Sequence, residues 1–217
     1  MCGRNTIFSD KKTIKNDFNV NIWKTEDEYV PTYNLSPTQL SPVLVKNEQR
    51  AIYIMRWGFG FQSAMKPIFN ARAETLSTKK TFKGLIEKNR CIVLSNGFYE
   101  WKNDGNTKIP YFIHHSDGKI IPMAGLCKWD IDQNGNRKLV YTVITKEART
   151  SLKDIHHREP VMLSKSSLSR WINVKSSTED PLSCLYDNID RISSYEVTKF
   201  VNKSSNDSRE CFQRILG

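Results

Sequence analysis

The feature that most constrains this chain is a succession of short apolar runs, rich in β-branched and aromatic residues and separated by Gly, Asn, Asp and Pro. Runs of this kind form strands, and the turn residues between them end each strand after a few residues. Predicted strands occupy residues 41–45, 51–59, 91–95, 97–101, 111–115, 120–126 and 139–145. The segments HSDGK (115–119) and DQNGN (132–136) lie between apolar runs and are predicted to be hairpin turns.

Helical spacing is confined to a few segments. Ser9 is predicted to cap a helix that carries Ile14 and Phe18 on one face. Residues 74–88 and 164–172 are the other predicted helices, and the second opens with a Ser cap. Helices that are interspersed with hairpins, rather than alternating strictly with strands, favour a β-rich α+β domain over a doubly wound parallel sheet.

Length and charge narrow the class of protein. With 217 residues and 38% hydrophobic content, the chain is predicted to form one domain with a proper core. No apolar run is long enough to span a bilayer, and the first residues show no secretory signal, so a cytoplasmic location without membrane contact is expected. The net charge of +10 (33 basic minus 23 acidic residues) favours polyanionic partners such as nucleic acid.

Cysteine usage excludes some chemistry. The count of five is odd and no C-x-x-C pair occurs, so neither a disulfide framework nor a zinc site is predicted. We predict no metal and no cofactor. Cys91, Cys127 and Cys184 are interpreted as small buried apolar residues, and Cys211 lies in a polar tail.

Cys2 differs from the other cysteines because it follows the initiator methionine. Removal of Met1 would place an α-amine, with a reference pKa of about 7.7–8.0, next to a thiol with a reference pKa of about 8.5. A 1,2-aminothiol condenses with an aldehyde: the amine forms an imine, the thiol adds to the same carbon, and a thiazolidine results. The alternative interpretation is a chance cysteine on a frayed terminus.

Two further segments carry candidate proton-transfer groups. In GFYEW (97–101), a strand would place Phe98 and Glu100 on one face, and a carboxyl among aromatic residues has a raised pKa suited to proton transfer. His156, which is adjacent to His157, can act as a general acid near neutral pH. A surface glutamate and a loop histidine pair are the alternatives.

Two segments carry candidate binding groups. In FNARAET (69–75), an extended chain places Asn70 and Arg72 on one face, where an amide and a guanidinium suit a phosphate or a sugar. Trp57, which follows Arg56, could stack on a base, and a buried core position is the alternative.

Several blocks occur together in an order that resembles the SRAP (SOS response-associated peptidase) family. The blocks are MCGR (1–4), YNLSP (33–37), RWG (56–58), NARAET (70–75), GFYEW (97–101), MAGL (123–126), TVIT (142–145) and IHHREP (155–160). The resemblance covers about residues 1–202, leaving 203–217 as a C-terminal tail. It implies an SRAP domain with a mainly antiparallel, barrel-like sheet and a few flanking helices.

The resemblance also implies an activity. Such proteins are abasic-site sensors and processing enzymes of the DNA damage response, and they form a covalent crosslink to the open-ring aldehyde of abasic sites in single-stranded DNA. The family name further implies a peptidase activity, self-removal of Met1. A monomer is expected, associated with the nucleoid if the chain is bacterial.

The resemblance assigns a role to each candidate residue. Cys2 would be the nucleophile, Glu100 would move protons, His156 would act as an acid at the sugar, and Asn70 would hold the amine or the sugar. The expected DNA contacts are Arg4, Asn34, Trp57, Arg72, Thr145 and Arg158.

One position departs from the family pattern, because Glu159 stands where a methionine is common. This carboxylate is expected to raise the pKa of His156 or to weaken phosphate contacts nearby. Two other functions remain open from the sequence alone. They are a thiol peptidase that uses Cys2 without a DNA role, and a non-catalytic single-strand-binding module.

Overall fold

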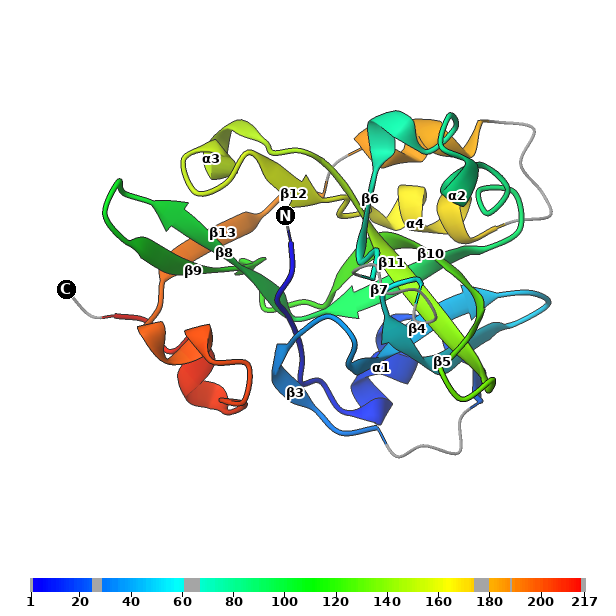
Figure 1. The fold of residues 1–217 in the computed structure, drawn as a ribbon, viewed down its shortest axis with the longest axis horizontal. Helices are drawn as coiled ribbons and strands as arrows, with labels where there is room; N and C mark the ends of the chain where they lie inside the picture. Colours follow the sequence, from blue (N-terminus) through cyan, green and yellow to red (C-terminus); the bar gives the residue numbers. More distant parts are fainter. Residues whose placement is uncertain (1, 25–28, 61–66, 174–179, 188, 216–217) are drawn as a thin grey trace.

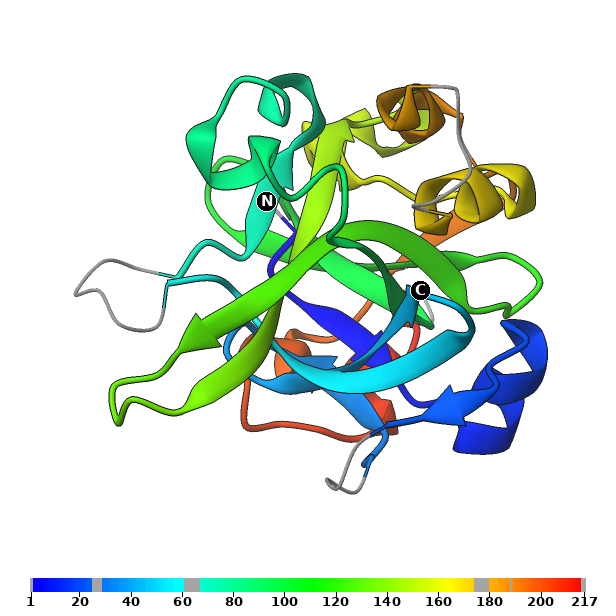
Figure 2. The same cartoon turned by 90° about the vertical axis from the view of Figure 1, so that its right-hand side faces the viewer.

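The computed structural model describes residues 2–24, 29–60, 67–173, 180–187 and 189–215 (Figures 1 and 2). The strands are β1 (Asn5–Ile7), β2 (Ile22–Trp23), β3 (Thr32–Leu35), β4 (Leu40–Lys46), β5 (Arg50–Trp57), β6 (Asn70–Arg72), β7 (Arg90–Ser95), β8 (Gly97–Asn103), β9 (Lys108–His115), β10 (Ile121–Ile131), β11 (Arg137–Glu147), β12 (Arg158–Pro160) and β13 (Ile192–Glu196). The α-helices are α1 (Lys11–Asp17), α2 (Lys80–Lys83), α3 (Thr150–Lys153) and α4 (Lys165–Ile172). Four 3-10 helices are η1 (Ala73–Thr75), η2 (Pro181–Tyr186), η3 (Lys199–Asn202) and η4 (Arg209–Phe212).

Five strands close into a barrel. The order β11–β10–β7–β4–β5 is antiparallel throughout, and β5 pairs back onto β11 in parallel, with Arg56 opposite Val140 and Trp57 opposite Tyr141. Strands β2, β6 and β12 add to the outside of this circuit. A closed circuit leaves no free edge within it, which stabilises strands that are too short to be stable alone. The predicted α+β domain with a mainly antiparallel, barrel-like sheet is confirmed.

A second sheet carries the beginning of the chain. Its order is β13–β9–β8–β1–β3, and in Figure 1 β8, β9 and β13 extend away from the barrel. Strand β1 lies between β3 and β8, with Asn5 opposite both Leu35 and Phe98. The residues that precede β1 are therefore fixed next to the strand that carries Glu100.

Side-chain alternation along the barrel strands builds two cores. On β7, Cys91 and Val93 join Met55, Trp57 and Tyr141 in one cluster inside the barrel. Ile92 and Leu94, on the other face of the same strand, belong to the cluster that packs against the helices. All six residues of β7 are buried, which explains why residues 91–94 in its middle are continuously apolar rather than alternating.

The helices only partly follow the prediction. Helix α4 was predicted, with Ser164 accepting a hydrogen bond from the Ser167 N–H. Helix α1 also forms and buries Ile14, but Asp10 caps it, since its carboxylate accepts the Thr13 N–H at 2.7 Å. The prediction that Ser9 caps this helix is therefore wrong.

The prediction of one long helix over residues 74–88 is also wrong. Only one 3-10 turn and the single turn of α2 form there. The hydroxyls of Thr75 and Thr78 bond back to the carbonyls of Arg72 and Thr75, and such local bonds compete with a helix.

One predicted hairpin is a connection between sheets. The strands that flank HSDGK belong to different sheets and do not pair, so that prediction is wrong. DQNGN does join β10 to β11, and Gly135 has the positive φ of 81° that this turn requires. The segment 104–107 also closes a hairpin, between β8 and β9, where the Asp104 carboxylate accepts the Thr107 N–H. Turn residues show where the chain bends, but not which strands pair.

The segment after residue 202 packs against the domain. The Asn34 side-chain amide donates to the carbonyls of Val201, Lys203 and Asn206, at 3.2, 3.0 and 2.6 Å. Cys211 is buried, although the sequence placed it in a polar tail. The domain boundary at residue 202 stays a prediction. Among the described residues, no helix is long and apolar enough to cross a membrane.

Candidate functional site

Four residues that were predicted separately meet at the start of the chain. Cys2 precedes β1, Asn70 begins β6, Glu100 lies on β8, and His156 follows α3. The Asn70 side-chain amide donates to the Cys2 carbonyl at 2.7 Å. The His156 Nδ1 lies 3.9 Å from Glu100 Oε1. The structure thus brings all four together.

Strand pairing positions Asn70. Strand β6 lies parallel to β11, with Asn70 opposite Val143 and Arg72 opposite Thr145. Ala71, between them, is buried in the outer core. Asn70 and Arg72 therefore share the opposite face, as predicted for an extended segment.

Glu100 is a buried carboxyl. Phe98, two residues earlier on the same face, lies in the cluster that contains Cys2, whereas Tyr99 points into another cluster. The Glu100 side chain is only 4% exposed. This burial raises the pKa of Glu100 to about 7, because the charged form loses its hydration. Near neutral pH the group can therefore both accept and donate a proton.

His156 is a neutral base or donor beside Glu100. Burial lowers the pKa of His156, so the uncharged ring predominates at pH 7. The His156 Nδ1 lies 3.0 Å from the Arg158 backbone nitrogen and 3.1 Å from the Arg158 carbonyl oxygen, so it accepts from the first in one tautomer and donates to the second in the other. His157 is exposed, although its ring centroid lies 4.4 Å from that of His156. Of the two, the structure places His156 against Glu100.

The Cys2 thiol is buried and protonated. Its exposed fraction is 1%, and burial together with the nearby Glu100 carboxylate raises the pKa of the thiol above its usual range. A thiol in this state needs a neighbouring base before it can act as a nucleophile. Glu100 is such a base.

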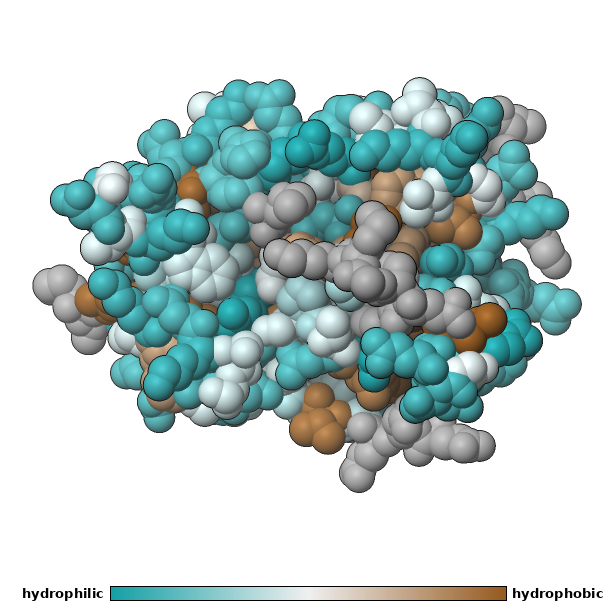
Figure 3. Space-filling view, viewed as in Figure 1, coloured by the Kyte–Doolittle hydropathy of each residue, from teal (hydrophilic) through white to brown (hydrophobic). Residues whose placement is uncertain are grey.

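A polar hollow opens onto Glu100 and His156. It encloses about 490 Å³ and is lined by Arg4, Glu100, Trp101, Lys108, His156 and Asn202. This volume falls within the range of roughly 300–1,000 Å³ that is typical of ligand sites. In the view of Figure 3, hydrophilic residues cover most of the visible face of the molecule. The sequence analysis missed Lys108 and Asn202, which no local pattern distinguishes, and Trp101, although it belongs to the GFYEW block.

The predicted phosphate-binding arginines are in different states. Arg72 is exposed. Arg158 donates to both carboxylate oxygens of Glu74, at 2.7 and 3.0 Å, and to the Thr145 carbonyl. The Arg158 hydrogen bonds lower the pKa of Glu74, which keeps the pair charged at neutral pH. The sequence analysis did not assign a role to Glu74. Its carboxylate binds Arg158 where a DNA phosphate was expected to bind.

Arg4 and Asn34 hold the C-terminal segment. The Arg4 guanidinium donates to the Asn34 side-chain oxygen and to the Val201 carbonyl, both at 2.7 Å. Asn34 is 1% exposed, and its amide is fully engaged with main-chain carbonyls. Arg4 still lines the hollow, but Asn34 has no accessible surface on which to line a DNA path.

Two other expected DNA contacts are buried. Trp57 is 0% exposed; its indole N–H donates to the Phe69 carbonyl, and its ring stacks on Tyr141 inside the barrel. Thr145 is 1% exposed in the middle of paired strands. Neither side chain can reach DNA in this conformation. For Trp57 the core alternative is the one observed.

Glu159 does not act on His156 as expected. It is 1% exposed and forms an ion pair with Arg149 at 2.9 Å. Arg149 also donates to the Ile189 carbonyl, which ties the chain after η2 to this pair. The pKa of His156 is lowered, not raised, and burial is the main cause.

The fold and site define a class: β-barrel proteins in which the second residue, a cysteine, is fixed beside a buried glutamic acid, an asparagine and a histidine. The family model for "SOS response associated peptidase (SRAP)" matches residues 1–204. The chain belongs to this family.

Known relatives cover nearly the whole chain. It is 35% identical to the abasic site processing protein YoqW of Bacillus subtilis, over 98% of this chain and 99% of the relative. It is 30% identical to the abasic site processing protein HMCES of Gallus gallus, over 89% of this chain and 69% of the relative. Among solved structures, a protein from Bacteroides thetaiotaomicron superposes with a TM-score of 0.82 at 25% identity, over 99% of this chain and 100% of that one.

Proposed function

We propose that this chain processes abasic sites in DNA by crosslinking to them. After loss of Met1, Cys2 would form a thiazolidine with the open-ring aldehyde of an abasic site in single-stranded DNA. The observation that carries the proposal is the placement of Cys2: Asn70 holds its carbonyl, next to a carboxyl whose pKa is about 7. The names of the relatives YoqW and HMCES support abasic DNA as the substrate.

The first step is imine formation. The Cys2 α-amine attacks C1′ of the open sugar, and the resulting carbinolamine loses its hydroxyl as water. Protonated Glu100, or the ring N–H of His156, supplies the proton that the departing oxygen needs. A carboxyl with a pKa near 7 is still about half protonated at neutral pH, whereas an ordinary glutamic acid is almost fully ionised.

The second step closes the ring. The Cys2 sulfur adds to the carbon of the protonated imine that the loss of water leaves, and the thiol proton passes to ionised Glu100. The positively charged nitrogen takes up the electron pair of the C=N bond and becomes the neutral ring amine. The total change is the loss of one water molecule. Because the thiol is protonated at neutral pH, this step depends on the base beside it. Reversal uses the same proton transfers in the opposite order.

The DNA would approach over a basic surface. Arg72 is exposed on the same face as Asn70, and Arg4 and Lys108 line the hollow. A single strand suits this site, because the abasic sugar must reach a cysteine that is 1% exposed and a paired, stacked strand would resist that movement. One chain carries all four residues, so the proposal requires only a monomer.

We also propose that the chain removes Met1 itself. The Asn70 amide fixes the Cys2 carbonyl, one peptide after the Met1–Cys2 bond. Water would add to the Met1 carbonyl, and Glu100 would move a proton from that water to the departing Cys2 nitrogen. Intact mass after expression tests this step. Retention of Met1 in Asn70→Ala and Glu100→Gln, but not in the exposed-residue control Glu48→Gln, is expected; complete removal in all variants would contradict it.

Crosslinking is tested with an oligonucleotide that carries one abasic site. The wild-type chain and a Cys184→Ala control, in which a distant buried thiol is removed, should give a band that survives denaturation. Cys2→Ala should give none. Cys2→Ala and Cys2→Ser both keep the α-amine once Met1 is lost, so each should be captured only when borohydride reduces the imine. A stable adduct with Cys2→Ala in the absence of borohydride would overturn the proposal, and salt-sensitive binding without any adduct would instead show a binding module.

A further inference from the structure

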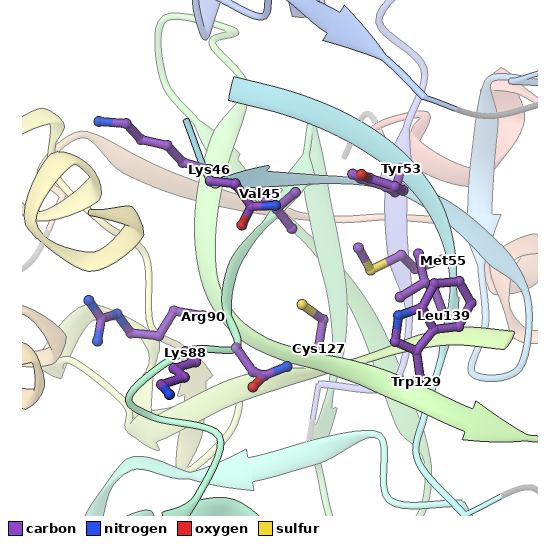
Figure 4. Close-up of a pocket in the computed structure, with 11 residues that line it drawn as sticks. Val45, Lys46, Tyr53, Met55, Lys88, Arg90, Cys127, Trp129 and Leu139 are labelled. Atoms are coloured by element: carbon purple, nitrogen blue, oxygen red, sulfur yellow. The ribbon is translucent and has the colours of Figure 1, made fainter. Parts of the chain in front are cut away.

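A cavity lies at one open end of the barrel, formed by residues to which the sequence analysis gave no binding role. All five strands of the closed circuit contribute to its lining: β4, β5, β7, β10 and β11. It encloses about 170 Å³, and Figure 4 shows side chains that line it. The mouths of β-barrels are common sites for small ligands. We call this cavity the barrel mouth, and its lining residues are Val45, Lys46, Asn47, Tyr53, Met55, Lys88, Asn89, Arg90, Cys127, Trp129 and Leu139.

The barrel mouth is separate from the Cys2 site. Deeper in the barrel, the rings of Trp57 and Tyr141 stack with their centroids 6.1 Å apart and their planes at 9°, and both are 0% exposed. This pair fills the interior beyond Met55. A molecule in the barrel mouth would therefore not reach Cys2.

One side of the barrel mouth is apolar. Met55, Leu139 and Val45 present aliphatic surface, Cys127 points its thiol toward the cavity, and Trp129 covers the side next to Leu139 (Figure 4). Trp129 is 54% exposed, and the Arg137 guanidinium lies over one face of its ring, 4.8 Å from the centroid, so a flat ligand ring would pack against the other face. An apolar cavity of about 150 Å³ holds benzene in another protein, so about 170 Å³ accommodates one ring.

The other side is cationic. Lys46, Lys88 and Arg90 lie across the cavity from Trp129, and no carboxylate is among the lining residues (Figure 4). The Lys46 ammonium donates to the Asn173 side-chain oxygen at 2.9 Å, a neutral partner that leaves its charge in place. Arg90 donates to the main-chain carbonyls of Ile86, Trp171 and Asn173, which fix its position without neutralising its charge. Within the described part of the chain, Lys88 has no ion-pair partner. The cationic side thus complements an anion.

We propose that the barrel mouth binds a small organic anion that consists of a single ring or a branched apolar group with one carboxylate. The ring would lie between Met55, Leu139 and Trp129, and the carboxylate would face Lys88 and Lys46. A cavity of this size excludes a nucleotide with its sugar and base, so the site is not an extension of the DNA path.

Three probes of equal size test the charge requirement: benzoate, benzyl alcohol and benzylamine. The readout is the methyl signal of Met55 in full-length protein labelled at the methionine methyls, with buried Met123 as the internal reference. Benzoate should shift the Met55 methyl saturably, benzyl alcohol more weakly and benzylamine least. No saturable shift with benzoate, or equal shifts with benzylamine, would overturn the proposal.

Two variants locate the probe. Lys88→Glu reverses a charge at the rim and should weaken benzoate binding about fivefold, whereas Lys138→Glu, an exposed neighbour on β11 outside the lining, should leave it unchanged. Leu139→Trp should fill the cavity and abolish the shift. Because Leu139 is only partly buried, this variant should fold, and retained crosslinking to abasic DNA checks that it has. Unaltered benzoate affinity in both Lys88→Glu and Leu139→Trp would place the probe elsewhere and refute the site.

Discussion

Glu100→Gln should stabilise the folded protein at high pH while it removes the proton-transfer group. Burial raises the pKa of Glu100 from an ordinary value of 4.5 to about 7 in the folded state. The folded state therefore binds this proton more tightly than the unfolded state, so stability is greatest below pH 4.5 and falls as the pH rises toward 7. The difference between the pKa of Glu100 in the folded and unfolded states lowers the free energy of unfolding by about 3 kcal/mol at pH 8. Glutamine cannot ionise and avoids this loss.

Urea unfolding at pH 5 and pH 8 measures the effect. The free energy of unfolding of the variant should exceed that of the wild type by about 3 kcal/mol at pH 8 and by less than about 1 kcal/mol at pH 5. In a chain of 217 residues, the gain at pH 8 corresponds to a rise in Tm of roughly 7 °C. Glu48→Gln, at an exposed position, should change stability by less than about 0.5 kcal/mol at either pH. An equal gain at both pH values, or destabilisation at pH 8, would refute the assigned pKa. Slower crosslinking is expected in the same variant.

Three other predictions concern the DNA surface and its support. Glu74→Gln should release Arg158 and raise affinity for undamaged single-stranded DNA severalfold in fluorescence anisotropy at low salt; unchanged or weaker binding would show that Glu74 does not compete with phosphate. Arg72→Ala should lower that affinity and flatten the log–log salt slope by about 0.7, whereas an unaltered slope would exclude a phosphate contact. Asn34→Ala removes three hydrogen bonds to residues 201–206 and should cost about 2–3 kcal/mol in urea unfolding; a loss below about 0.5 kcal/mol would mean that Asn34 does not anchor this segment.

Much of the fold was predictable because it is encoded locally. Strand Arg90–Ser95 begins one residue before its predicted range and ends with it, and Arg137–Glu147 extends two residues beyond its predicted range at each end. Apolar runs and turn residues mark such strands directly. Strand partners are not encoded locally. The parallel pairing of β5 with β11 closes the barrel, and no pattern in either segment shows it.

Site residues were predictable where the residue type and its neighbours in the sequence indicate a particular reactivity. Cys2 and Glu100 were chosen for reactivity and for aromatic neighbours, and the structure places them in one site. Trp57 and Asn34 show the limit of this reasoning, because a stacking ring or an amide in sequence does not reveal which side of a strand faces solvent. Glu74 was missed because its role depends on Arg158, which lies 84 residues away in the chain.

Intact mass of the product with abasic DNA tests the central claim most directly. The account predicts one species whose mass equals the chain without Met1, plus the oligonucleotide, minus one water molecule, and it predicts that Cys2→Ala forms no such species. The water distinguishes condensation from simple addition, and the missing methionine shows that the Cys2 amine took part. An adduct that retains Met1, or one that forms equally with Cys2→Ala, would contradict thiazolidine formation at Cys2.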